Sequence, residues 1–143
     1  MAGVGLPDIT VTFPGGKKVD ANFWQFTVNT DQPVKDGGEN SAPAPFLMFL
    51  TSLGTCAGIF VLSFCQNRNL PTEGITLTQR HAFAPGEKPN SMRLATVEID
   101  VNVPATFPEK YHGALVKVAN KCAVKQVLQD PPEIVVNTVV QEE

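Results

Sequence analysis

The chain has 143 residues, of which 43% are hydrophobic and 17% are charged, and its formal net charge at pH 7 is -3. This length and composition are typical of one globular domain that buries a core without disulfide bonds, so we expect a single domain over residues 1–143. The negative net charge argues against the basic surface that nucleic-acid binding requires, and we expect no nucleic-acid partner.

The N-terminal residues and the cysteines indicate in which cellular compartment the protein resides. The segment MAGVGLPDITVTF has no basic stretch before an apolar one and does not resemble a secretory signal. The chain has three cysteines, an odd number at wide spacing, which a reducing compartment would keep as thiols. We therefore expect a cytoplasmic protein without structural disulfides.

The first elements are expected to be β-strands. Hydrophobic and polar residues alternate over residues 9–13, and Pro14–Gly16 then predicts a turn into a second strand over residues 19–28. The hydrophobic phase of this second strand changes at Phe23–Trp24, which indicates a bulge or a strand buried on both faces. Residues 30–45 follow as a loop. Loops of this length more often take part in function or in an interface than merely connect two elements.

From Ala44 to Cys65 the sequence has no charged residue, and this length is sufficient to cross a membrane. Several threonines, serines and glycines within the segment argue against a membrane span. The alternative is a central helix with Pro45 in its first turn, which ends near Asn69 because Pro71 cannot continue it. We favour this helix, apolar all round because sheet and helices enclose it, and expect no membrane partner.

Three strands are expected in the C-terminal half. One begins at Ile75 and ends at Pro85–Gly86. Strict alternation of polar and branched hydrophobic residues over 96–103 predicts the next, with one buried and one polar face. Residues 133–140 predict the last strand of the chain.

A second helix should lie before this last strand. Thr106 and Glu109 have the spacing of a capping box, and Asp130–Pro132 ends the helical region. Hydrophobic residues at helical spacing put Cys122 on the buried face. The predicted fold class is α+β, with an antiparallel sheet, a long central helix and the element order ββ-α-ββ-α-β.

Two of the three cysteines are candidates for redox chemistry. A helix advances about 100° per residue, so Cys65, nine positions after Cys56, points to the opposite side and cannot share a pocket with it. We expect Cys65 to be a small hydrophobic residue of the core or of an interface. Because free cysteines are more often buried structural residues, composition leaves catalytic roles for Cys56 and Cys122 open.

Two segments around these cysteines resemble the motifs of a known family. APAPFLMFLTSLGTCAG, which contains Cys56, is similar to the first-cysteine motif of the OsmC/Ohr family of thiol-dependent hydroperoxide reductases. KVANKCAVKQVL, which contains Cys122, is similar to the second. The resemblance covers nearly the whole chain. Ala123 replaces a proline that often follows the second cysteine, so the helix need not break there.

The resemblance implies an assembly. Members form intertwined homodimers in which the two central helices lie back to back and each thiol pair lies at the subunit boundary. Such a homodimer would explain the uncharged helix, because association buries apolar surface that would otherwise be exposed.

The resemblance also implies an activity in oxidative or osmotic stress defence. Cys56 would attack the O–O bond of a small apolar organic hydroperoxide and become a sulfenic acid, which Cys122 would resolve as a disulfide. A dithiol would reduce the pair, and a lipoyl-type dithiol is one candidate. Because Cys56 lies in mid-helix, we expect a cation to lower its pKa. No cofactor is implied, and neither His81 nor His112 has zinc-like spacing to a cysteine pair.

The sequence departs from the family in two charged positions. Active members pair an arginine after the first hairpin strand with a glutamate directly after the proline that leads the helix. The nearest residues here are Lys17, which lacks the planar fork of arginine, and Phe46, which holds no cation. Glu39 could reach the site instead, although loop glutamates are more often solvated. The alternative hypothesis is therefore an OsmC-like binding or stress-related protein with weak or no peroxidase activity.

Overall fold

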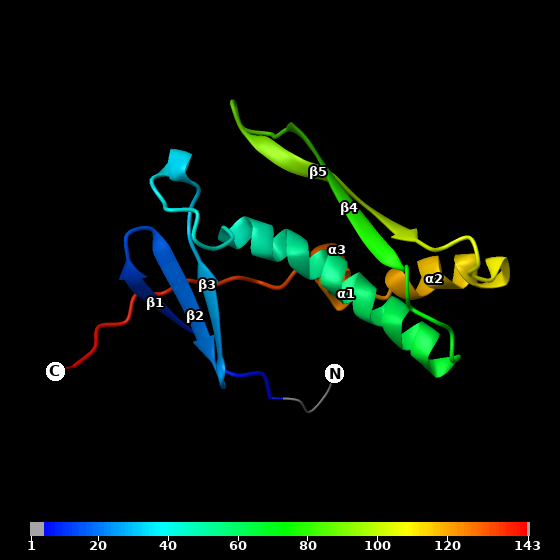
Figure 1. Ribbon diagram of the computed structural model, residues 1–143. Coiled ribbons are helices and arrows are strands. Elements are labelled where there is room, and N and C mark those ends of the chain that lie inside the picture. Colours follow the sequence, from blue (N-terminus) through cyan, green and yellow to red (C-terminus); the bar gives the residue numbers. More distant parts are fainter. Residues whose placement is uncertain (1–4, 143) are drawn as a thin grey trace. The chain divides into compact units, whose positions relative to one another are not determined.

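The structure is a computed structural model that describes residues 5–142 (Figure 1). The chain divides after Thr51 into two compact units, and the boundary falls inside the long helix α1 (Pro45–Asn67). The single domain over residues 1–143 stays a prediction.

The first unit contains a three-stranded antiparallel sheet in the order β1-β2-β3. Its strands are β1 (Thr10–Gly15), β2 (Lys18–Phe23) and β3 (Phe26–Thr30). The single strand predicted over residues 19–28 is therefore wrong, because a tight turn at Trp24 divides it. Trp24 has a positive φ of 46°, and the rings of Phe23 and Phe26 pack across the turn with centroids 5.8 Å apart. The change of hydrophobic phase marks this turn and not a bulge.

Helix α1 begins at Pro45 and ends as the sequence predicts. After its last residue, Asn69 adopts the left-handed conformation with φ of 53°, and the backbone N–H of Leu70 donates to the carbonyl oxygen of Cys65 at 2.9 Å. These contacts form a Schellman C-cap, which satisfies a carbonyl that the helix leaves unpaired. A short 3-10 helix, η1 (Val34–Asp36), precedes α1 in the loop of the first unit.

Within the second unit, one face of α1 is buried and others are exposed. Within the second unit, the buried residues of this helix are Leu53, Ala57, Val61, Phe64 and Cys65. On other faces Ile59 is 53% exposed and Leu62 is also exposed. The expectation that sheet and helices enclose α1 on all sides is therefore wrong within the second unit. Among the described residues, α1 is also the one helix long and apolar enough to span a membrane, a property that it shares with core helices of soluble proteins.

The second unit contains an antiparallel hairpin of β4 (Thr76–Pro85) and β5 (Met92–Asn102). Leu77 faces Val101 across the pair, and a register shift occurs between Ala82 and Phe83. Both strands lie where the sequence predicts strands, and β5 begins a few residues earlier than the alternating pattern.

The predicted second helix is divided into three pieces. These are η2 (Glu109–Tyr111), α2 (His112–Ala119) and α3 (Ala123–Gln129). The Asn120 side chain donates to the Val116 carbonyl oxygen at 3.0 Å and closes α2, whereas Cys122 is the N-cap of α3 and its sulfur accepts the Lys125 N–H at 3.4 Å. The helix thus breaks before Ala123 without a proline, and the expectation of a continuous helix is wrong.

The capping box predicted from Thr106 and Glu109 is not formed. Helix η2 begins after Pro108, which has an extended ψ of 122°, and no side-chain hydrogen bond caps it. The Phe107 N–H is instead bonded to the Pro104 carbonyl oxygen at 2.9 Å, so Thr106 lies inside a turn.

The last predicted strand, residues 133–140, is absent, because residues 131–142 form neither helix nor strand. Its hydrophobic side chains are exposed, with Val136 the most accessible at 89%. A strand forms only where its backbone groups pair with a neighbouring strand, and within residues 5–142 this segment has no such partner. The α+β class, the antiparallel sheets and the long helix are nevertheless confirmed.

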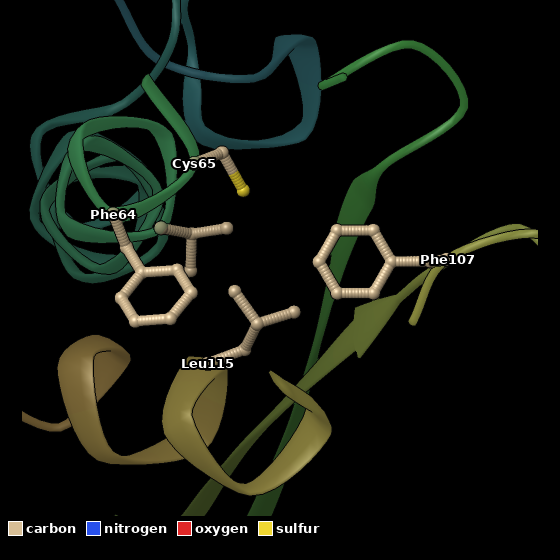
Figure 2. Close-up of a cluster of buried hydrophobic side chains, with 5 residues drawn as sticks. Phe64, Cys65, Phe107 and Leu115 are labelled. Atoms are coloured by element: carbon tan, nitrogen blue, oxygen red, sulfur yellow. The ribbon is translucent and has the colours of Figure 1, made fainter. Parts of the chain in front are cut away.

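The buried core of the second unit lies between α1 and α2. Figure 2 shows Phe64 and Cys65 projecting from α1 toward Leu115 of α2 and toward Phe107. Val61 completes the cluster. Cys65 is fully buried, which confirms the expectation that it is a small core residue.

Candidate active site

The structure brings Cys56 and Cys122 together in the second unit. Cys56 lies on α1, Cys122 lies at the start of α3, and the Cys122 thiol forms a hydrogen bond with the Cys56 sulfur. Both are free thiols. Residues that are 66 positions apart in the sequence are therefore neighbours, as a reversible disulfide between them requires.

The start of α3 supplies further donors to Cys56. The first N–H groups of a helix have no carbonyl partner within it, and here the N–H groups of Ala123 and Val124 are bonded to the Cys56 sulfur. The Cys122 sulfur accepts the Lys125 N–H at 3.4 Å and lies 3.9 Å from the Leu53 carbonyl oxygen. The break between α2 and α3 therefore brings the Cys122 sulfur and the N–H donors of α3 next to the Cys56 sulfur.

These donors make Cys56 the more acidic thiol. Burial by itself would raise the pKa of Cys56, but hydrogen bonds from the Val124 N–H, the Cys122 thiol and the Ala123 N–H outweigh it and lower the pKa below the ordinary thiol value. Such bonds favour the thiolate because a sulfur anion accepts them more strongly than a neutral thiol. In this unit the groups that lower the pKa are therefore neutral donors and not the cation that we expected.

Cys122 shows the opposite shift. Burial raises the pKa of Cys122, and its hydrogen bond and repulsion with Cys56 raise it further, although the Lys125 N–H acts against them. The opposite shifts therefore favour the thiolate form at Cys56 over the thiolate form at Cys122. Cys65 is separate from the pair, and burial in the core raises the pKa of its thiol.

The two other predicted site residues, Lys17 and Glu39, lie in the first unit. Lys17 is exposed in the turn between β1 and β2. The Glu39 carboxylate is paired with Lys18, whose Nζ lies 2.7 Å from it, and this pair raises the pKa of Lys18. The structure therefore joins Glu39 to Lys18, which is not among the predicted site residues. Catalytic roles for Lys17 and Glu39 stay predictions.

A buried carboxylate that the sequence did not predict, that of Asp31, organises the loop that carries Glu39. Asp31 is only 1% exposed, and its oxygens accept hydrogen bonds from the backbone N–H groups of Gln32, Glu39 and Ser41 and from the Ser41 hydroxyl at 2.6 Å. The bonds to Ser41 are the main cause that lowers the pKa of Asp31 far below its ordinary range. An aspartate ahead of a Gly-rich loop was the available signal, since Asp side chains commonly bond backbone N–H groups in turns.

A cavity of about 660 Å³ lies in the second unit beside Cys122. Its wall is made by α1, β5, α2 and α3, and most of the side chains are aliphatic, among them Leu53, Val97 and Leu115. Cys122 belongs to this wall and Cys56 does not. The cavity size is within the range of small-molecule sites, which is about 300–1,000 Å³.

The histidines have local contacts. The ring of His112 stacks on Phe107 with centroids 6.0 Å apart, and His81 contacts the side chain of Gln79. Across residues 5–142, no three His, Cys, Asp or Glu side chains are placed to hold one metal ion.

Comparison with known proteins decides the family. Residues 38–137 match the family described as OsmC-like protein. The chain belongs to this family. The match confirms the family resemblance of the two cysteine motifs. No curated protein matches the chain significantly.

Solved structures with the same fold cover most of this OsmC-like chain. One is a putative osmotic stress induced and detoxification response protein from Psychrobacter arcticus, with a TM-score of 0.69, 21% identity, and coverage of 88% of this chain and 90% of that one. Another is a putative organic hydroperoxide resistance protein from Vibrio cholerae with captopril bound in one active site, with a TM-score of 0.59, 17% identity and coverage of 89% and 88%. A third is the organic hydroperoxide resistance protein OsmC from Legionella pneumophila, with a TM-score of 0.57, 17% identity, and coverage of 88% of this chain and 92% of that one. At these identities the likeness establishes the fold.

Removing the Cys122 thiol should raise the pKa of Cys56. We expect Cys122→Ala to raise it, because a hydrogen bond to a charged group stabilises the thiolate by about 1.5 kcal/mol. Cys122→Ser, which keeps an O–H donor, should raise it less. The measurement is the rate of iodoacetamide alkylation of Cys56 against pH, followed by peptide mass spectrometry. An unchanged or lower pKa in Cys122→Ala would contradict the assigned hydrogen bond.

Asp31 should make the stability of the first unit depend on acid pH. Because folding holds the pKa of Asp31 below its unfolded value of about 3.9, its contribution to stability is complete above that value and is lost as the pH falls through the lower folded value. We expect Asp31→Asn to be less stable at pH 7 and to show a flatter loss of stability below pH 4. Urea unfolding at several pH values tests this, with Asp36→Asn in the same loop as the control. Equal pH dependence in all three proteins would refute it.

Proposed function

We propose that the protein reduces organic hydroperoxides in oxidative or osmotic stress defence, with Cys56 as the attacking thiol and Cys122 as the resolving thiol. The observation that carries this proposal is the hydrogen-bond contact between two free thiols, of which Cys56 has a lowered pKa and Cys122 a raised one. Membership of the OsmC-like family and likeness to proteins named for hydroperoxide resistance support it.

The two thiols divide the reaction between them. The Cys56 thiolate attacks one peroxide oxygen, an S–O bond forms, and the O–O bond breaks to release an alkoxide that takes a proton from water. Cys56 is then a sulfenic acid. The Cys122 sulfur attacks the Cys56 sulfur, and the hydroxyl group leaves as water with the Cys122 proton. The product is a Cys56–Cys122 disulfide, which a dithiol reduces.

A weaker activity is the second candidate function, and the charged residues of the first unit favour it. Phe46 stands where active members carry a glutamate, and Glu39 is already paired with Lys18. In that case the same fold would bind a small thiol-reactive or apolar ligand, and hydroperoxide turnover would be slow.

We also propose that the protein is an intertwined homodimer in the cytoplasm. The exposed apolar side chains of α1, among them Ile59, and those of residues 133–140 form surface that soluble monomers rarely leave uncovered. A second copy would cover this surface under two-fold symmetry.

The peroxidase proposal predicts a defined fate for each thiol. One equivalent of cumene hydroperoxide should consume two thiols of the reduced protein, and Cys56→Ser should lose more than a hundredfold in rate because the nucleophile is absent. Cys122→Ser should stop at a sulfenic acid that dimedone traps. Cys65→Ala is the control and should react as the wild type does. Turnover by Cys56→Ser would disprove the role of that thiol, and a slow wild-type reaction would favour the ligand-binding function.

The dimer proposal predicts that a charge on the exposed face of α1 separates the subunits. Wild-type protein should have the mass of two chains in light scattering, and Ile59→Glu should have the mass of one, because burying an unpaired carboxylate is unfavourable. Gln66→Glu, at an exposed polar position of the same helix, is the control. A wild-type monomer would contradict the proposal, and recovery only in detergent would favour the membrane-spanning alternative for α1.

A further inference from the structure

Helix α3 is short and contributes little to the buried core. None of its seven residues, Ala123–Gln129, is buried, whereas its N-cap Cys122 is only 2% exposed. Isolated helices of fewer than about 12 residues are marginal in water, so a helix of this length depends on contacts outside itself. The last turn offers few of these, because Val127 and Leu128 are both 51% exposed. The contacts at the first turn therefore contribute most to holding α3 in place.

The first three N–H groups of α3 are bonded to sulfur. Residues 123 and 124 donate to Cys56, and Lys125 donates to Cys122 at 3.4 Å. Gln126 is the first residue of the helix whose N–H is bonded to a carbonyl oxygen, that of Cys122 at 3.1 Å. Helix N-termini are commonly capped by the side-chain oxygen of Ser, Thr, Asp or Asn, which thiol oxidation does not change. The cap of α3 consists instead of two sulfurs, whose chemical state can change.

The strength of these hydrogen bonds depends on the redox state of the two sulfurs. A charged acceptor binds an N–H group about twice as strongly as a neutral one, and the lowered pKa of Cys56 favours its charged form. In a disulfide with Cys122 both sulfurs are neutral. Oxidation therefore weakens the bonds from residues 123 and 124, which hold the first turn of α3.

We propose that α3 is a redox-responsive element of the fold, ordered while the two thiols are reduced and loosened when Cys56 and Cys122 form a disulfide. The disulfide ties Cys122 to α1, but the N–H groups that follow lose their charged acceptor. Residues 131–142, which follow α3, then lose their connection to an ordered helix. The inference rests on the proposed function only in needing a cysteine pair that alternates between dithiol and disulfide.

Hydrogen exchange measured by mass spectrometry compares α3 in the reduced and the oxidised protein. Diamide takes two electrons and two protons from the thiol pair and becomes a hydrazine, while an S–S bond forms between Cys56 and Cys122. We expect the amides of α3 to exchange at least fivefold faster after oxidation, because local opening exposes them to water. The amides of α2, in the same unit, should change less than twofold.

Reduction of the oxidised protein with dithiothreitol should restore slow exchange in α3, and this reversal is the control for damage by diamide. Unchanged or slower exchange in α3, an equal increase in α2, or failure of diamide to join the two cysteines would overturn the proposal. Because diamide makes the disulfide, the result does not depend on activity toward hydroperoxides. A protein that loosens α3 but does not turn over hydroperoxide would refute the peroxidase function alone.

The coupling also acts in the opposite direction. Two linked equilibria influence each other by the same free energy, so the thiolate of Cys56 favours an ordered α3 and an ordered α3 favours the thiolate. A substitution on the surface of α3 should therefore change the pKa of Cys56 without touching either sulfur.

Gln126→Gly tests this direction, because glycine disfavours a helix and the Gln126 side chain is exposed. We expect this substitution to raise the pKa of Cys56, measured from the rate of iodoacetamide alkylation against pH. Gln66→Gly, the same change at an exposed position of α1, is the matched control and should leave the pKa of Cys56 as in the wild type. If Gln126→Gly also has the wild-type pKa at Cys56, α3 and the thiol pair are not coupled and the proposal fails.

Discussion

The arrangement of the site depends on the break between α2 and α3. In a continuous helix the N–H groups of Ala123 and Val124 would be bonded to carbonyl oxygens four residues earlier, at Ala119 and Asn120. The break leaves these groups without helical partners, and they are bonded to the Cys56 sulfur instead. The same break makes Cys122 an N-cap whose thiol meets Cys56. One local change of backbone direction therefore supplies the donors and positions the second thiol.

Stabilisation of the thiolate by neutral donors changes the meaning of the charged residues that this chain lacks. Backbone N–H groups do not titrate, and at hydrogen-bond distance they are screened by salt less than a cation on a flexible lysine side chain would be. The donors of the second unit thus lower the pKa of Cys56 without a cation among them. In the proposed reaction, loss of the arginine and glutamate would affect how the hydroperoxide is held more than how the thiol is ionised.

Hydrophobic period and helix-breaking residues predicted most elements of the fold. The extent of α1, the β4–β5 hairpin and the separation of Cys65 from Cys56 all follow from residue spacing. The turn at Trp24 and the break at Cys122 did not, because neither contains the glycine or proline that usually marks such points. For the site, the sequence selected the two cysteines through a family resemblance. It could not reveal the backbone donors, which carry no side-chain signal, or the burial of Asp31, which depends on the closed loop.

Two wrong expectations have a common physical cause. The pattern of α1 indicated a helix buried on all sides, and the pattern of residues 133–140 indicated a strand. In the described second unit, however, one face of the helix is exposed and the segment is unpaired. A hydrophobic pattern indicates that a surface is buried, but not whether the same chain or a second chain covers it. Both patterns are therefore informative about an assembly even where they fail for the single chain. The proposed homodimer is the simplest assembly that would cover the helix face and give the last segment a strand to pair with.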